Sequence, residues 1–205
     1  GISFDSSHQE IETTRQTVLG PAVPPDYVAL LEGRQQTVAG FGTFQFGIGE
    51  WTFQPGVRAE NYRREVISAG IESDEVDTRY FPSVHIRRGL GEHIDVDLSY
   101  TSRIQRPGFN QLDPALRFID VNRAITGNPD LEPSLTDAYE ANLTYQNAGR
   151  SFSFTLYDRI SEDIFSPFTE TLLDGTILTT TVNAGTSEQR GAQAILRGPL
   201  SVRWR

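Results

Sequence analysis

The chain contains no cysteine, no methionine and no lysine. Without cysteine, neither a disulfide framework nor a cysteine-ligated zinc site can form. All 18 basic residues are therefore arginine, which we attribute to codon bias in a GC-rich genome. Methionine is missing even at position 1 and no signal peptide is visible, so we expect a processed or excised part of a longer protein.

Long apolar runs are also missing. A transmembrane helix needs about 18 or more consecutive apolar residues, and the sequence contains no such stretch. Hydrophobic residues make up only 37% of the chain, whereas 18 glycines, 11 prolines and 10% aromatics favour strands and turns. A membrane β-barrel stays possible, since its signal per strand is much weaker. The net charge of −9 argues against nucleic acid as a partner.

Short glycine-containing turns alternate with long polar connections along the chain, without exception. This order is typical of an outer-membrane barrel, whose strands are joined by tight turns at one end and long loops at the other. The predicted short turns are 47–50, 89–92, 147–150 and 198–199, and the predicted long connections are 17–33, 65–77, 106–134 and 164–177.

The segments between these connections alternate between apolar and polar residues, which predicts strands with one oily face. In 93–104 the alternation is clearest, and 178–197 is predicted as one long strand. Because Arg87 and Arg88 are adjacent, one of them must lie on the oily side near a turn. We expect about nine strands, the last at 200–205. The predicted oily faces carry Trp51, Phe53, Val57 and Ala59; Ile94, Val96, Leu98 and Tyr100; Tyr139, Ala141, Leu143 and Tyr145; and Phe152, Phe154 and Leu156.

Aromatic residues gather near both kinds of connection, which predicts two interfacial belts. The belt near the short turns would contain Trp51, Tyr145, Phe152 and Trp204, and the belt near the long connections Tyr62, Tyr80, Phe81 and Tyr139.

One central block is more specific than these patterns. "YTSRIQRPGFNQLDP" (100–114) and "TGNPDLEPSLTDAYE" (126–140) resemble the C-terminal barrel half of TonB-dependent outer-membrane receptors. "FGTFQFGIGEWTFQPGVRAENYR" (41–63) and "VNAGTSEQRGAQAILRGPL" (182–200) are similar to flanking hairpins of that family. The chain departs from the family pattern at Ser134 and Gln193, where glutamate is usual.

The resemblance implies an all-β fold, an antiparallel up-and-down meander of about nine strands within a larger transmembrane barrel of about 22. Residues 1–205 would be one partial barrel domain, without the family's N-terminal plug. It also implies an outer-membrane receptor of a Gram-negative bacterium that binds a scarce, bulky ligand and imports it with energy from TonB. The partners would be outer-membrane lipid, the TonB complex acting through the plug, and an iron chelate, cobalamin-like molecule or oligosaccharide. We expect no cofactor, no metal site and no enzymatic activity.

Two groups of residues follow as candidates for function. One would line the lumen and face the plug or a passing ligand, although such residues also simply line water. The other would form a ligand-binding mouth, in which arginine could grip a carboxylate or phosphate, unless the loop packs on itself around Phe109 and Phe118. The lumen group is Arg58, Glu60, Asp95, Asp97, Arg103, Glu140 and Asn142, and the mouth group is Arg106, Phe109, Asn110, Phe118, Arg123 and Asn128.

Alternative functions make different demands on the fold. A soluble all-β carbohydrate- or ligand-binding module would have to hide its oily face, Ile94 to Tyr100, against a second sheet. An outer-membrane enzyme would need a histidine-containing pair, for which Ser83 and His85 share a face. A metal site from His93, Asp95 and Asp97 would need all three on one face and a second strand to close it.

Overall fold

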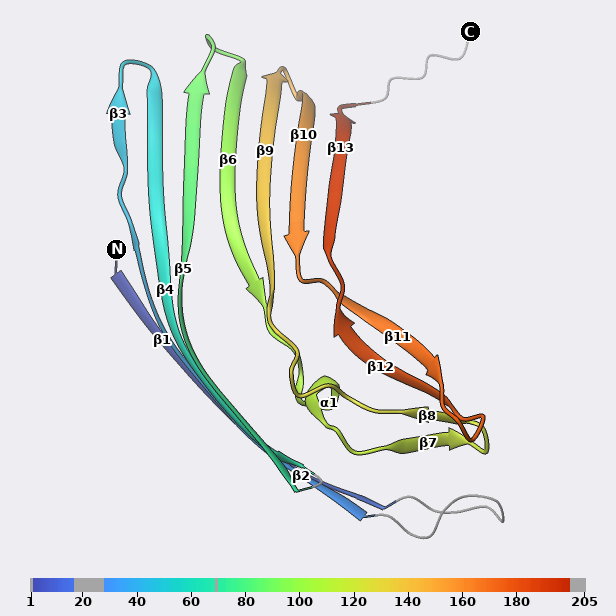
Figure 1. Ribbon diagram of the computed structural model, residues 1–205. Helices are drawn as coiled ribbons and strands as arrows, with labels where there is room; N and C mark the ends of the chain where they lie inside the picture. The colour runs from blue at the N-terminus through green and yellow to red at the C-terminus, as the bar shows by residue number, and fades with distance from the viewer. Residues whose placement is uncertain (1, 17–27, 69, 200–205) are drawn as a thin grey trace, which may run out of the picture.

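The computed structural model describes residues 2–16, 28–68 and 70–199, and most of them lie in one curved sheet (Figure 1). The strands of this sheet are β1 (Ile2–Gln16), β2 (Val28–Thr43), β3 (Phe46–Ile48), β4 (Trp51–Ser68), β5 (Ile71–Gly89), β6 (Ile94–Gln105), β9 (Ser134–Asn147), β10 (Arg150–Glu162) and β13 (Thr186–Arg197). It counts nine strands in the order β1-β2-β4-β5-β6-β9-β10-β13, with β3 pairing beside β4. All these pairs are antiparallel. The predicted all-β meander is therefore confirmed, and the predicted strand 200–205, with Trp204, lies outside the described residues.

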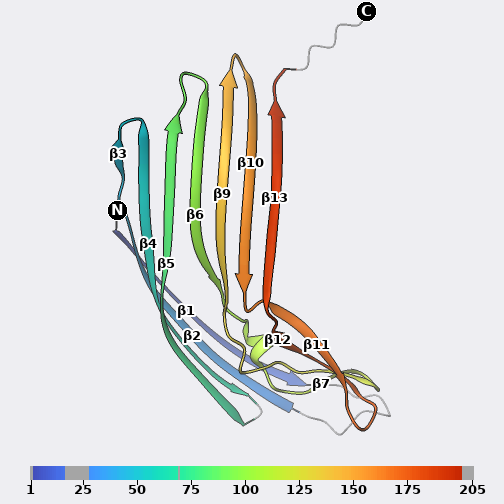
Figure 2. The same cartoon turned by 45° about the horizontal axis from the view of Figure 1, so that its top comes forward.

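The sheet is open within the described part of the chain, because β1 and β13 are its two edges and do not pair with each other. Figure 1 shows a single layer bent like part of a cylinder wall, with the tight turns together at one end. Figure 2, turned from that view, shows the same curvature and the same grouping of turns.

A second, smaller sheet lies at the other end and was not expected from the sequence. It contains β7 (Arg117–Asp120), β8 (Arg123–Ile125), β11 (Phe165–Thr171) and β12 (Ile177–Asn183) in the order β11-β12-β8-β7. A single turn of helix, α1 (Phe109–Leu112), lies beside it. Among the described residues no helix has the length and hydropathy needed to cross a membrane. We call residues 106–133 and 163–185, which hold these elements, the cap.

One predicted strand and one predicted connection are wrong, and another predicted connection, 17–33, extends too far, because residues 28–33 belong to β2. Residues 178–197 form two strands instead of one, because Ala184 and Gly185 interrupt them with Gly185 at φ 58°. Residues 65–77 form no long loop: β4 and β5 continue until Ser68 pairs with Ile71, and Gly70 at φ 78° completes the reversal. Charged residues hide the strand pattern there. The pairing stays favourable because Arg64 lies opposite Glu75, with 3.1 Å between Nη2 and Oε2.

The strand register assembles the predicted oily residues into one continuous face, because directly opposed residues of an antiparallel pair share a side. Leu143 lies between Val96 and Phe154, and Leu98 lies between Ile86 and Ala141. We call this the outer face. No second layer covers it in the described residues: Leu98 is 38% and Leu143 39% exposed. A soluble sandwich would bury both, so the observed fold contradicts that alternative.

The predicted belt at the tight turns is confirmed for Trp51, Tyr145 and Phe152, which all lie on the outer face. Arg88 also lies there, with its Cζ 5.1 Å from the centroid of the Trp51 ring. It is therefore the one of the two adjacent arginines that was expected on the oily side. An arginine stacked this way keeps its charge near water while its stem stays against apolar surface.

The second belt is only half right. Tyr80 and Tyr139 are exposed on the outer face, and Tyr100 stacks with Tyr139 at 4.9 Å between ring centroids. Tyr62 and Phe81 point to the opposite, inner face and are buried. Both were misplaced because closeness to a loop in sequence does not say which side of the strand a residue occupies.

Candidate lumen wall and mouth

The cap is anchored to the inner face by a small hydrophobic core. Phe109 and Leu112 of α1 and Leu131 pack with Leu31 of β2 and Val66 of β4. Glycine is required at position 33 of β2, because a Cβ there would come within 2.5 Å of the Phe109 ring. Phe109 was predicted to contact ligand, but it is only 8% exposed and belongs to this core. Phe109 thus packs on Leu112 and Leu131 of its own connection and on Leu31 and Val66 of the strands.

An ion cluster fastens the start of the cap. Arg106 Nη1 donates to Glu60 Oε2 at 2.8 Å, and Arg58 Nε donates to Glu60 Oε1 at 2.7 Å. The Arg106 guanidinium also lies over the Tyr62 ring at 4.3 Å. Tyr62 is completely buried. The structure thus joins a predicted mouth residue, Arg106, with two predicted lumen residues, Arg58 and Glu60, in one contact.

Asp113 provides a second fastening point that the sequence did not indicate. Its Oδ1 accepts hydrogen bonds from Ser68 Oγ at 2.7 Å and from the Ala115 amide at 3.0 Å. Both Ser68 and Asp113 are buried, so the loss of the Asp113 carboxylate would leave the Ser68 hydroxyl and the Ala115 amide without this acceptor. The tip of the β4–β5 hairpin is thereby held to the cap.

The remaining predicted mouth residues are separated over the cap. Asn128 shapes a turn, since its amide donates to Gln111 O at 2.7 Å and its Oδ1 accepts from the Asp130 amide at 3.0 Å. Phe118 on β7 is half-buried. Asn110 on α1 and Arg123 on β8 are exposed.

Arg123 is held in place by its neighbour across the β7–β8 turn. Its Nε donates to Asp120 Oδ2 at 2.7 Å, and this hydrogen bond, with that of the Asn122 amide, lowers the pKa of the Asp120 carboxyl. Arg123 therefore offers its other guanidinium nitrogens to solvent on the surface of the cap.

The inner face of the main sheet is polar and contains a depression. A depression of about 620 Å³ is lined by Asp97, Glu140 and Asn142, all predicted lumen residues, together with His85 and Gln54. Asp95 and Arg103 are exposed on the same face, outside this lining. The structure thus brings three of the predicted lumen residues into one depression of the inner face.

Two arginines missed by the sequence reasoning complete this wall. Arg87 Nε donates to Asp97 Oδ1 at 2.6 Å, and Arg159 Nη2 donates to Glu140 Oε1 at 2.8 Å. Asn142 Oδ1 accepts from the hydroxyls of Ser153 and Thr155 at 2.8 and 3.1 Å. The sequence did contain a signal for Arg87 and Arg159: in the two-residue period of their strands, both fall on the same face as the predicted lumen residues.

Two histidine hypotheses have different outcomes. Ser83 and His85 share the inner face as expected. His93 lies before β6 and packs edge-on against Tyr145 of the outer face, with ring centroids 6.1 Å apart. It therefore does not share the inner face of Asp95 and Asp97, so these three residues lack the common face that a metal site built from them would need.

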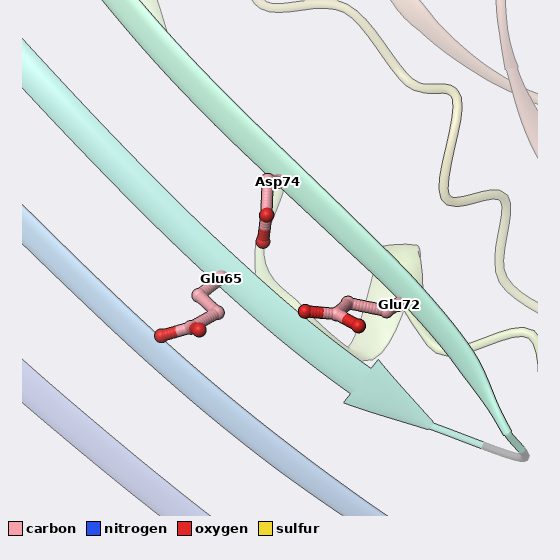
Figure 3. Close-up of side chains that lie close together, drawn as sticks. All are labelled: Glu65, Glu72 and Asp74. Carbon is pink, nitrogen blue, oxygen red and sulfur yellow. The ribbon is translucent and has the colours of Figure 1, made fainter.

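Three carboxylates gather on the outer face of the β4–β5 extension (Figure 3). Glu65 of β4 and Glu72 and Asp74 of β5 have oxygens within 4.8 Å of one another, and all three are exposed. Exposed acidic groups are common without an ion, so we assign no metal site to them. Their charge marks the part of the sheet that extends beyond the apolar band, since carboxylates are costly in hydrocarbon.

Replacing Arg106 by lysine tests how the cap is held. Lysine keeps the charge beside Glu60 but loses the planar group that stacks on Tyr62, so we expect about 1 kcal/mol less stability. Arg58→Lys is the matched control, because the Arg58 side chain is 37% exposed and should cost less than about 0.5 kcal/mol. Urea unfolding of both variants measures the difference, and equal losses would contradict the stacking role.

Comparison with known proteins agrees with this architecture. The family model described as "Outer membrane protein beta-barrel family" matches residues 3–205. None of the curated protein sequences matches the chain.

Solved structures with the same fold include three membrane proteins. A double mutant of the Serratia marcescens hemophore receptor HasR, in complex with its hemophore HasA and heme, has a TM-score of 0.71 at 12% identity, over 95% of this chain and 39% of that one. The copper transporter OprC has a TM-score of 0.71 at 11% identity, over 98% of this chain and 33% of that one. The ferric-catecholate import receptor Fiu from K12 E. coli has a TM-score of 0.63 at 16% identity, over 98% of this chain and 32% of that one. The chain thus spans well under half the length of each of these structures.

Proposed function

The chain belongs to the outer membrane protein beta-barrel family, and from this premise we propose that it forms part of the wall and mouth of an outer-membrane receptor for active transport. The receptor would bind a scarce, bulky ligand at the cell surface and import it with energy transmitted by TonB. The open edges β1 and β13 would pair with further strands of the complete barrel.

One observation carries this proposal: a polar, hollowed inner face lies under a folded cap, while the opposite face is apolar. A simple membrane anchor needs the apolar face only. The ion pairs and amide contacts along the inner wall, such as Arg87–Asp97 and Arg159–Glu140, suit contact with water, a plug or a polar ligand. Three structurally similar proteins, a hemophore receptor, a copper transporter and a ferric-catecholate import receptor, support uptake as the class of activity.

The roles of the mouth residues divide according to their contacts. We assign Arg106 and Phe109 to holding the cap, because Arg106 contacts Glu60 and Tyr62 of β4 and Phe109 packs against β2 and β4. Arg123 and Asn110 are the exposed polar groups that would reach a ligand, with Arg123 binding a carboxylate or another anionic group. An iron chelate, a cobalamin-like molecule or an oligosaccharide would each supply polar groups of this kind. We expect no covalent chemistry.

Uptake by cells tests the proposal. The full-length protein is expressed in a Gram-negative strain without its own iron-chelate receptors, and entry of labelled ferric catecholate, ferric hydroxamate, haem, cobalamin and malto-oligosaccharide is measured. We expect one class to enter, only when TonB is present, and Arg123→Ala to reduce its uptake roughly tenfold through loss of a charge-assisted contact.

Arg150→Ala is the matched control for this variant, because Arg150 is exposed at a tight turn at the other end of the sheet. It should leave uptake unchanged. Entry that persists without TonB would refute the energy source, and entry of none of the five probes would refute the proposed ligand classes.

A further inference from the structure

The Asn183-Ala184-Gly185 segment, part of a family-like stretch in the sequence, has a structural role that the proposed function does not use. Asn183 is the last residue of β12. Its Nδ2 donates to the carbonyl oxygens of Glu132 at 2.8 Å and Asp163 at 2.9 Å, and its Oδ1 accepts from the Glu132 amide at 2.9 Å. Both amide hydrogens and the amide oxygen are therefore engaged.

These contacts join segments that are far apart in sequence. Glu132 belongs to the other family-like stretch, just before Pro133 and β9, and Asp163 lies between β10 and β11 with φ at 53°. One side chain thus links the end of the first cap segment, 106–133, to both ends of the second, 163–185. Ala184 N also donates to Ile164 O at 2.8 Å, which closes the base of the β11–β12 hairpin.

Phe165 of the second segment packs against the core that contains Phe109, Leu112 and Leu131 of the first, and the backbone links that the structure describes between the two segments are short. The parallel pairing of β12 with β8 covers only Ile177 to Thr179 against Arg123 to Ile125. At its two ends, Ile177 N donates to Asn122 O at 2.7 Å and Thr126 N donates to Thr179 O at 3.0 Å. A pairing this short is expected to fray unless its base is fixed.

We infer that Asn183 is the positioning residue that makes the two cap segments one body. It fixes the base from which β8 and β12 run side by side, so that β7 and β8 keep their place relative to β10 and β13. Arg123 on β8 is thereby held over the sheet. The coupling is a property of the cap and does not depend on which ligand the receptor takes.

Amide hydrogen exchange of the full-length protein in detergent tests this inference. In Asn183→Ala we expect protection to fall about tenfold or more in two places, residues 177–183 and, in the other segment, residues 117–126, because three hydrogen bonds are lost together. Asn183→Asp should do the same, since a carboxylate cannot donate to two carbonyl oxygens. Asn147→Ala is the control, because Asn147 Nδ2 donates to Tyr145 Oη at 3.1 Å at the tight-turn end.

A disulfide provides the rescue, and the absence of cysteine in the chain makes it clean. Ile125 and Thr179 are register partners of β8 and β12. Adding Ile125→Cys and Thr179→Cys to Asn183→Ala should restore protection of 117–126 when oxidised and lose it again when reduced.

Two results would overturn the inference: exchange that rises only in 177–187, or an oxidised variant that stays unprotected. If Asn183→Ala is not recovered in the membrane, Asn183→Ser, which keeps a hydroxyl donor, is measured on the same peptides and judged by the same results.

Discussion

Arginine in place of Leu143 is expected to lower the free energy of unfolding in a bilayer by about 2–4 kcal/mol, the cost of a charge near the middle of a barrel's lipid face. Leu143 is 39% exposed and lies between Val96 and Phe154, in the centre of the outer face. The guanidinium of the introduced arginine would have to reach the membrane interface along a path lined by apolar side chains. Guanidinium-chloride unfolding of the full-length protein in lipid vesicles measures the loss.

Thr144→Arg is the matched control for this prediction. Thr144 is the next residue of β9, faces the lumen and lies opposite Asp95, which would receive the new charge. We expect a change below about 1 kcal/mol, because lumen positions accept polar groups. Equal losses for both variants would mean that the outer face does not meet hydrocarbon, and the membrane orientation derived for the sheet would be wrong.

Alanine in place of Gly127 is expected to cost about 1–3 kcal/mol by overpacking, and to loosen the cap. A Cβ there would lie 2.6 Å from the carbonyl oxygens of both Asp113 and Gln111. These are backbone atoms, so no side chain can swing aside. Gly127 N and Asn128 N donate to the same two oxygens at 2.7 Å, and both hydrogen bonds would have to lengthen.

Gly108→Ala is the control within the same segment. Gly108 has φ of −78°, and the nearest atom to an added Cβ is Gln111 Oε1 at 3.8 Å, so we expect stability to change by less than about 1 kcal/mol. Limited proteolysis between residues 106 and 133 measures both variants. Cleavage of Gly127→Ala at the rate of Gly108→Ala would show that the close approach does not constrain the cap.

The family and the two faces of the sheet were predictable because both depend on short stretches of sequence. The motif-based relationship to TonB-dependent receptors agrees with the family match and with the fold of solved receptors. The outer face needed only the two-residue period of a strand, as in Ile94 to Tyr100, since every second side chain points the same way. Arg88 was placed by the same reasoning.

The cap was not predictable in this way. Phe109 looked like an exposed loop aromatic, and its burial depends on Gly33, Leu31 and Val66, which belong to other strands. The β8–β12 pairing depends on contacts such as Asn122 with Ile177, for which neither segment carries a regular pattern. The β4–β5 extension was missed because many of its residues are charged, so apolar and polar residues do not alternate clearly along either strand. The charges are instead matched between the two strands, as where Arg64 lies opposite Glu75.

The sequence by itself determines the main sheet, its two faces and the order of its strands. Apolar and polar residues alternate along each strand, glycines form the tight turns, and pairing between consecutive strands requires only residues that are close in sequence. Contacts between distant segments decide which mouth residues are buried, which are fastened to the wall and which face a ligand. Their positions result from chain closure over long loops and from side-chain packing at the cap, and no short stretch of sequence contains that information.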